Sequence, residues 1–107
     1  MTVIVEHHLE LKGAEHKMVV RLFKPEPRKD APGWKCRFEI GEPFNYGLDI
    51  YGEWGLQALV LAISGLSVML YTSPEYRSGR LGIAGEFGDF LGLPAPSILL
   101  DEAPYPF

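Results

Sequence analysis

The sequence predicts an α+β domain: a four-stranded antiparallel meander with one long apolar helix packed on its inner face. Two observations support this class. Residues 2–51 contain four segments in which apolar and polar side chains alternate, which is typical of strands with one buried face. The 21 residues from 54 to 74 carry no charge, and apolar residues recur there at helical spacing. The 107 residues predict a single domain, with a sheet at 2–51, a helix at 53–73 and an irregular Gly- and Pro-rich tail at 74–107.

The first two strands are predicted at residues 2–11 and 16–24, joined by a hairpin loop at 12–15. One register pairs apolar side chains on one face and opposite charges on the other. The expected pairs are Leu11 with His16, Leu9 with Met18, His7 with Val20, Val5 with Leu22, Glu10 with Lys17, Glu6 with Arg21, and Ile4 with Phe23. A slip of one residue would move every apolar side chain to the other face, so this register is favoured.

A loop and a second hairpin follow. Residues 24–33 contain three prolines and several charges, and they are expected to form an exposed loop outside the sheet. Alternating segments at 34–40 and 44–50 then form two strands around a turn at 41–43. The expected pairs are Ile40 with Phe44, Trp34 with Ile50, and Lys35 with Asp49.

The uncharged segment is expected to form the helix that covers the apolar face of the sheet. Its predicted inner stripe is Leu56, Leu59, Val60, Ile63, Leu66 and Leu70. Its predicted outer face is Gln57, Leu61, Ser64, Val68 and Tyr71. Gly65 inside a helix indicates close backbone packing, and Pro74 ends the helix at or before Ser73.

The remaining residues predict less regular structure. Residues 75–93 are expected to form a loop with a short strand near 81–84 and a turn of helix near 87–91. Residues 94–107 contain four prolines and are expected to be extended.

Composition argues against several classes of function. The net charge of −4 disfavours general nucleic-acid binding, which depends on basic contacts to phosphate. The uncharged segment contains serines, a threonine and a glutamine and lacks flanking basic clusters, which disfavours a membrane span. The chain has one cysteine and no secretory signal, so we expect a cytoplasmic protein.

No set of residues predicts a catalytic, metal or cofactor site. His7 and His8 are neighbours on a strand and point to opposite faces, so they cannot share a metal ion. Cys36 is expected to be buried and inert, and His7 to be a half-buried structural histidine. The glycine-rich run at 79–88 lacks the known phosphate-binding patterns, although Arg77 and Arg80 leave a weak anion site open.

Two candidate sites remain. The first is a partner surface on the outer helix face: Trp54, Gln57, Leu61, Ser64, Val68 and Tyr71. The alternative is that residues 81–107 of the same chain cover this face. The second candidate is a ligand pocket between the sheet and the tail, lined by Trp34, Tyr46, Arg77 and Arg80.

Three segments carry a resemblance to known proteins. They are Trp34-Lys35-Cys36-Arg37-Phe38, the run Tyr-Gly-Glu-Trp-Gly-Leu-Gln-Ala-Leu at 51–59, and Leu91-Gly92-Leu93-Pro94. Over about residues 3–94 the chain resembles a family of small uncharacterised bacterial domains with a Trp-led strand and a Gln-Ala-Leu helix start. Members often carry an acidic residue at the position of Trp54. The family has no assigned activity, so the resemblance implies no functional residue.

These observations predict a small, non-catalytic interaction or accessory protein that binds a protein partner or a second copy of itself. An immunity-type protein that neutralises a toxin is one version, by analogy with other small acidic domains. The alternative is a small-ligand-binding protein, or an enzyme, with a pocket between the sheet and the C-terminal tail.

Overall fold

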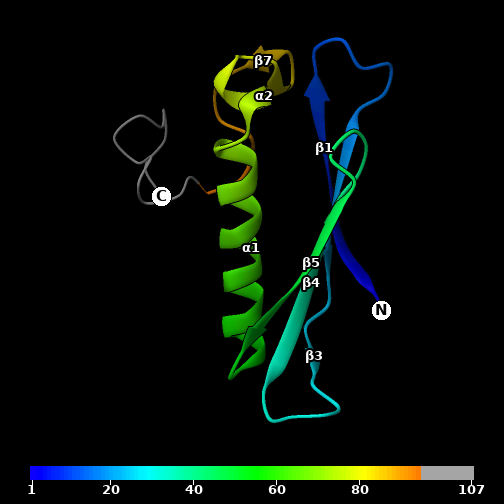
Figure 1. Cartoon of the computed structure of the whole chain (residues 1–107), viewed down its shortest axis with the longest axis vertical. Coiled ribbons are helices and arrows are strands. Elements are labelled where there is room, and N and C mark those ends of the chain that lie inside the picture. The colour runs from blue at the N-terminus through cyan, green and yellow to red at the C-terminus, as the bar shows by residue number, and fades with distance from the viewer. Residues whose placement is uncertain (95–107) are drawn as a thin grey trace.

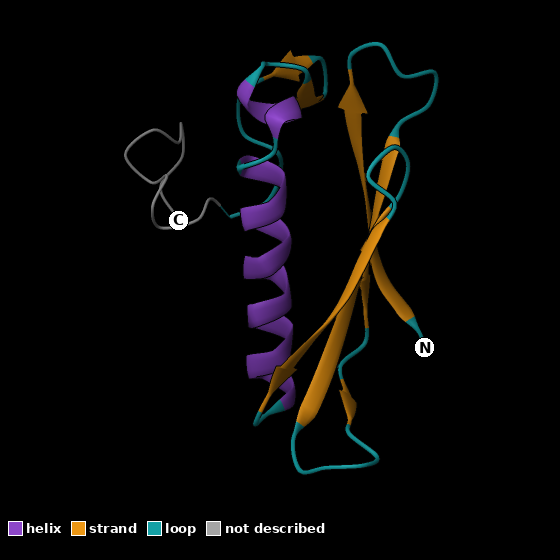
Figure 2. Cartoon of the chain, in the orientation of Figure 1, coloured by secondary structure: helices purple, strands orange, loops and turns teal. Residues whose placement is uncertain are grey.

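A computed structural model describes residues 1–94 and shows an α+β fold, in which a seven-strand antiparallel sheet packs against one 17-residue helix (Figures 1 and 2). The sheet runs in the order β3-β4-β2-β1-β6-β7, and β5 pairs with β4. The elements in chain order are β1 (Val3–Leu11), β2 (Met18–Phe23), β3 (Glu26–Pro27), β4 (Trp34–Ile40), β5 (Tyr46–Gly52), α1 (Gly55–Tyr71), α2 (Pro74–Arg77), β6 (Leu81–Ile83) and β7 (Glu86–Phe87).

The four predicted strands are present in the predicted order, β1-β2-β4-β5, and three short strands extend them. β6 confirms the strand expected near 81–84, whereas β3 and β7 were not predicted. The expectation of a loop outside the sheet at 24–33 is wrong for Glu26 and Pro27, which pair with Lys35 and Trp34 of β4. A proline is tolerated there because β3 is a two-residue strand at an edge of the sheet.

The register of the first hairpin is confirmed over most of its length, and three of its expected pairs are wrong. The pairs Val5 with Leu22, Glu6 with Arg21, His7 with Val20 and Leu9 with Met18 all form. A bulge between Val3 and Val5 replaces the expected pair of Ile4 with Phe23 by Val3 with Phe23, because a bulge sets two residues against one. Pairing with β2 stops at Met18, and Glu10 and Leu11 pair instead with β6, so their expected pairs with Lys17 and His16 do not form.

The second hairpin keeps its predicted faces but is offset by two residues. Ile40 pairs with Tyr46 rather than Phe44, Cys36 pairs with Ile50, and Arg37 pairs with Asp49. The cause is a longer turn: the amides of Phe44 and Asn45 both donate to the carbonyl of Gly41, at 3.1 Å each. An even offset leaves each side chain on its expected face, because side chains along a strand alternate with a period of two.

Helix α1 is shorter than predicted at both ends, and a second short helix follows it. Trp54 occupies the N-cap position and Thr72 the C-cap position. Pro74 ends α1 as expected, but it also starts α2 as its first residue, where its missing N–H costs nothing. The Ser73 hydroxyl joins the two helices, since it donates to the Leu70 carbonyl at 2.7 Å and accepts from the Tyr76 amide.

The core lies between α1 and one face of the sheet (Figure 2). Leu59 and Ile63 pack against it as predicted. α2, β6 and β7 gather at the C-terminal end of α1 (Figure 1), where residues 88–93 follow β7 with no helical turn, contrary to the turn expected near 87–91. The fully buried residues are Leu9, Cys36, Phe38, Ala58, Ala62, Leu70, Leu81 and Leu91. The extended tail expected at 95–107 lies outside the described residues.

Within residues 1–94, no helix combines the length and the apolar character that crossing a lipid bilayer requires.

Candidate functional site

Helix α1 contacts the core through small residues as well as through Leu66 and Leu70, which are buried as predicted. Ala58 and Ala62 are fully buried. A Cβ built on Gly55 would lie 3.2 Å from the Trp34 ring, and one on Gly65 would lie 3.6 Å from Phe38 and 3.8 Å from Ile50. Small residues at these positions let this side of the helix approach β4 and β5 closely, whereas Leu56, Val60, Leu61 and Val68 remain exposed.

This close contact corrects the predicted inner stripe. Leu56 is 73% exposed and Val60 is 52% exposed, so two of the six residues expected to face the sheet point to solvent. The residues that face the sheet instead include Ala58 and Ala62, which the pattern of large apolar side chains did not select. The orientation of the helix is therefore set by how closely the backbones approach and not by side-chain size alone.

Five of the six residues of the predicted partner surface are exposed: Trp54, Gln57, Leu61, Ser64 and Val68. The sixth, Tyr71, is only 4% exposed, so its assignment to an exposed face is wrong. Its hydroxyl donates to the Leu93 carbonyl at 2.8 Å and accepts from the Leu91 amide at 3.0 Å. Residues 91–93 therefore cover the last turn of α1. This agrees in part with the alternative that residues 81–107 of the same chain cover the outer helix face. The rest of that face stays open within residues 1–94.

Leu61 and Val68 lie on the flank of α1 that is nearest to β5. Gly65 contacts Phe38 of β4 and Ile50 of β5. Leu61 precedes Gly65 by four residues and Val68 follows it by three, so all three share one side of the helix. We call the exposed apolar area formed there the α1–β5 surface; it consists of Leu61 and Val68 of α1 and Tyr46 and Leu48 of β5.

The outer edge of β5 borders the α1–β5 surface. β5 forms seven consecutive pairs with β4, without a bulge. In the part of the chain that the structure describes, no strand pairs with the other edge of β5. Every second residue of an edge strand turns its backbone N–H and C=O groups away from the sheet, where they are available to another strand.

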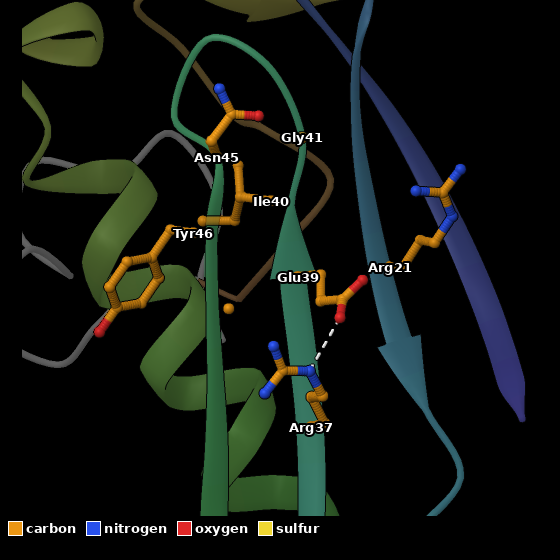
Figure 3. A pocket seen from close by; sticks show the side chains of 8 residues that line it. Arg21, Arg37, Glu39, Ile40, Gly41, Asn45 and Tyr46 are labelled. Carbon is orange, nitrogen blue, oxygen red and sulfur yellow. Dashed lines mark hydrogen bonds and ion pairs between the residues drawn. The ribbon is translucent and has the colours of Figure 1, made fainter. Parts of the chain in front are cut away.

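The face of the sheet that α1 does not cover carries charged side chains that pair with each other, both within a strand and between neighbouring strands. Arg37 donates from Nε to Glu39 at 2.8 Å (Figure 3) and from Nη1 to Asp49 at 3.2 Å. The hydrogen bond to Glu39 raises the pKa of the Arg37 guanidinium. Arg21 donates to Glu6 at 2.7 Å, and this hydrogen bond lowers the pKa of the Glu6 carboxyl. The pairs neutralise most of the charge on this face.

An open hollow of about 330 Å³ lies on the charged face near the turn between β4 and β5 (Figure 3). Its lining is Arg21, Arg37, Glu39, Ile40, Gly41, Asn45, Tyr46 and Gly47. Both arginines are already paired with carboxylates, so the hollow offers little uncompensated positive charge to an anion.

The four residues of the predicted ligand pocket do not come together. The Trp34 ring packs on the start of α1 at Gly55. Tyr46 lies at the other end of β5, beside Phe38. Arg77 and Arg80 lie in and after α2, at the opposite end of the helix from Trp34 (Figure 1), and Arg80 donates to Ser78 at 2.8 Å. The structure therefore shows no shared pocket for them within residues 1–94.

The reactive and titratable side chains of the interior have structural partners. The Cys36 thiol is buried and donates to the Phe23 carbonyl at 3.2 Å, and burial raises its pKa. His7 is half-buried, as expected, with Nε2 2.7 Å from the Leu91 carbonyl. Across residues 1–94, no three His, Cys, Asp or Glu side chains lie close enough to bind a metal ion.

The sequence interpretation missed the open edge of β5. The signal was present, because the segment Tyr-Gly-Leu-Asp-Ile-Tyr-Gly contains neither proline nor lysine, the residues that commonly protect an edge. What was missing was the knowledge that the chain leaves β5 for the helix and does not return to its free side within residues 1–94.

A family model described as a domain of unknown function, DUF6968, matches residues 5–95. The match confirms the expected resemblance to an uncharacterised domain family. No curated protein and no solved structure gives a significant match.

Proposed function

The chain belongs to the DUF6968 family of domains of unknown function, and we propose that it is a small, non-catalytic protein-interaction domain. The observation that carries the proposal is the α1–β5 surface. Its members are exposed although they are large and apolar: Leu61 is 42% exposed and Val68 is 43% exposed. Exposed apolar areas next to a free strand edge are typical of surfaces that bind protein.

The charge distribution supports a protein partner. Residues 54–74 contain no charged side chain, so a partner does not have to desolvate charges on α1 when it binds. An immunity-type protein that binds a toxin is one version of this function, and it rests on analogy with small acidic domains alone.

A small-ligand-binding function, or an enzyme, is the second candidate. It would use the hollow beside Asn45, because Trp34, Tyr46, Arg77 and Arg80 do not form a common pocket. The pairing of Arg21 and Arg37 with carboxylates makes this hollow the weaker candidate.

Matched charge substitutions test the proposed function. Leu61→Glu and Val68→Glu change the α1–β5 surface, and Leu56→Glu changes a more exposed leucine on the other flank of α1. The full chain is crosslinked in cells and the amount of crosslinked partner, whether another protein or a second copy, is measured. We expect the first two variants to recover roughly tenfold less of the wild-type partner, or lower still. Leu56→Glu should retain it.

Thermal unfolding serves as the folding control, because exposed substitutions shift stability by only about 0.5 kcal/mol. Equal partner recovery with all three folded variants would contradict the proposed function.

A further inference from the structure

We propose that the occupant of the α1–β5 surface is a second copy of this chain, whose β5 pairs antiparallel with β5 across a two-fold axis at Leu48. This inference rests on the proposed function, since it names the partner of the same surface. The dimer would contain one continuous sheet, with both α1 helices on the same face.

The regularity of the free edges favours β5 as the pairing strand. β3 and β7, which end the sheet elsewhere, are two residues long and offer few backbone groups. Residues 3–9 of β1, which β6 does not pair, form an edge as long as β5, but a bulge interrupts this edge and it carries Glu6 and His8. β5 is seven residues long, and it is regular throughout its ladder with β4. Long, regular edges without proline or lysine are the ones that recruit another strand.

The side chains of β5 select one register. Two residues directly opposite each other in an antiparallel pair have their side chains on the same side of the sheet. Side chains along β5 alternate between the two sides, so opposite residues differ by an even number of positions, and the two-fold axis passes through a residue and not between two residues. An axis at Asp49 would set two carboxylates opposite each other, which is unfavourable. An axis at Leu48 sets Leu48 against the partner subunit's Leu48 and Tyr46 against the partner subunit's Ile50, so apolar side chains meet on the helix-covered face.

The same register sets charge against opposite charge on the other face. With the axis at Leu48, Gly47 faces the partner subunit's Asp49. The Arg37 guanidinium lies over Gly47, and its Nη2 is the nearest atom to the space that a Cβ of Gly47 would fill. Arg37 uses Nε for Glu39 and Nη1 for Asp49 of its own chain, so Nη2 is the nitrogen left to donate to the partner's carboxylate.

The helix flank completes the interface on the apolar face. Leu61 and Val68 lie on the side of α1 nearest to the free edge, so the two-fold axis brings the flanks of the two helices toward each other. Strands alone bury little apolar area, whereas a stable dimer commonly buries about 800 Å² on each partner. Tyr46, Leu48, Leu61 and Val68 are large apolar side chains that remain exposed and would supply this area.

Disulfide trapping tests the register. The Leu48→Cys chain should crosslink to itself, because facing residues in an antiparallel pair have Cα atoms about 4.5–5.5 Å apart, within disulfide range. Tyr46→Cys and Ile50→Cys should crosslink to each other when mixed, and much less to themselves. Cys36, the one native cysteine, is buried and gives a low background. Leu56→Cys, exposed on the far flank of α1, is the matched control and should form no disulfide between copies.

Sedimentation equilibrium gives a second measurement that needs no crosslink. The wild-type chain should show a monomer–dimer equilibrium, and Leu48→Lys should weaken it by roughly thirtyfold or more, as substitutions at an interface centre do. Leu56→Lys should leave it unchanged.

The outcomes separate this inference from the proposed function. A wild-type chain that stays monomeric at high concentration would overturn the dimer, and so would efficient trapping of Leu61→Cys without trapping of Leu48→Cys. The wild-type chain could instead be monomeric, bind a different protein and lose that protein on Leu61→Glu substitution. In that case the proposed function stands and only the identity of the partner is wrong.

Discussion

At the scale of single residues, two polar side chains hold the last described segment against the core. Tyr71 of α1 bonds the amide of Leu91 and the carbonyl of Leu93, and His7 of β1 reaches the carbonyl of Leu91. Leu91 is thereby fully buried. A Cβ on Gly92, which has a φ of +80°, would approach the His7 ring at 2.7 Å, so glycine is required there both by conformation and by space.

Removal of the Tyr71 hydroxyl should destabilise the fold. Tyr71→Phe leaves the buried Leu91 amide without its acceptor, and we expect a loss of about 1–3 kcal/mol in the free energy of unfolding, measured by urea denaturation. Tyr51→Phe is the matched control, because Tyr51 is 52% exposed and should change stability by less than about 0.5 kcal/mol. Equal stability of the two variants would show that the hydrogen bonds of Tyr71 contribute nothing.

The same residue predicts an alkaline pH dependence. Burial raises the pKa of the Tyr71 phenol, so the folded state keeps this proton at a pH where the unfolded state has lost it. The contribution of Tyr71 is therefore fully present below the unfolded tyrosine pKa of about 10 and is lost as pH rises above it. Urea midpoints measured from about pH 8 to pH 11 should fall less steeply for Tyr71→Phe than for the wild-type chain.

At the scale of elements, the contact between α1 and the sheet decides which side chains are exposed. Besides Leu66 and Leu70, the contact contains alanines that are fully buried and glycines at which an added Cβ would meet Trp34, Phe38 or Ile50. The sequence indicated close packing at Gly65, and the distances to Phe38 and Ile50 show ordinary contact with room for one methyl group.

Gly65→Ala should therefore stabilise the protein. A Cβ would meet Phe38 at 3.6 Å without a clash, while glycine costs about 0.5–1 kcal/mol in a helix interior, so we expect a gain of that size and a higher melting temperature. Gly55→Ala is the control, because its Cβ would press on the Trp34 ring at 3.2 Å in the first turn of α1. A lower melting temperature for Gly65→Ala would mean that the helix lies closer to the sheet than described.

At the scale of the whole molecule, one helix covers one face of the sheet and leaves the β5 edge free. On the opposite face, charged side chains form ion pairs, such as Arg37 with Asp49 and Arg21 with Glu6. The ends of the sheet at β3 and β7 are short. Within residues 1–94, β5 thus has a long and regular free edge, whereas the unpaired edge of β1 is interrupted by a bulge.

Hydrogen exchange should detect pairing at this edge. If β5 pairs between copies, alternate amides within residues 46–50 should exchange more slowly as protein concentration rises, because they become hydrogen-bonded. The amides of Glu86 and Phe87 in β7, at an edge outside the proposed interface, provide the internal control. Exchange in β5 that does not depend on concentration would contradict the pairing.

Much of the fold followed from local patterns in the sequence. Alternation predicted the four long strands, and the charge pair of Glu6 with Arg21 predicted the first register correctly. The second register was offset because the turn after Gly41 takes two more residues than its sequence indicated. Five of the six residues expected on the outer face of the helix are exposed. Tyr71 was misplaced because its cover, Leu91 and Leu93, comes from a segment with no recognisable pattern.

The sequence by itself determined which segments are strands, where the long helix lies and that this helix carries no charge. Only the tertiary structure decided which side of that helix faces the sheet and which strand keeps a free edge. The physical reason is that alternation and helical spacing are local properties of the chain. The rotation of an apolar helix depends on how closely Ala58, Ala62 and Gly65 can approach Trp34, Phe38 and Ile50, and an edge stays free or becomes paired according to the path of the whole chain.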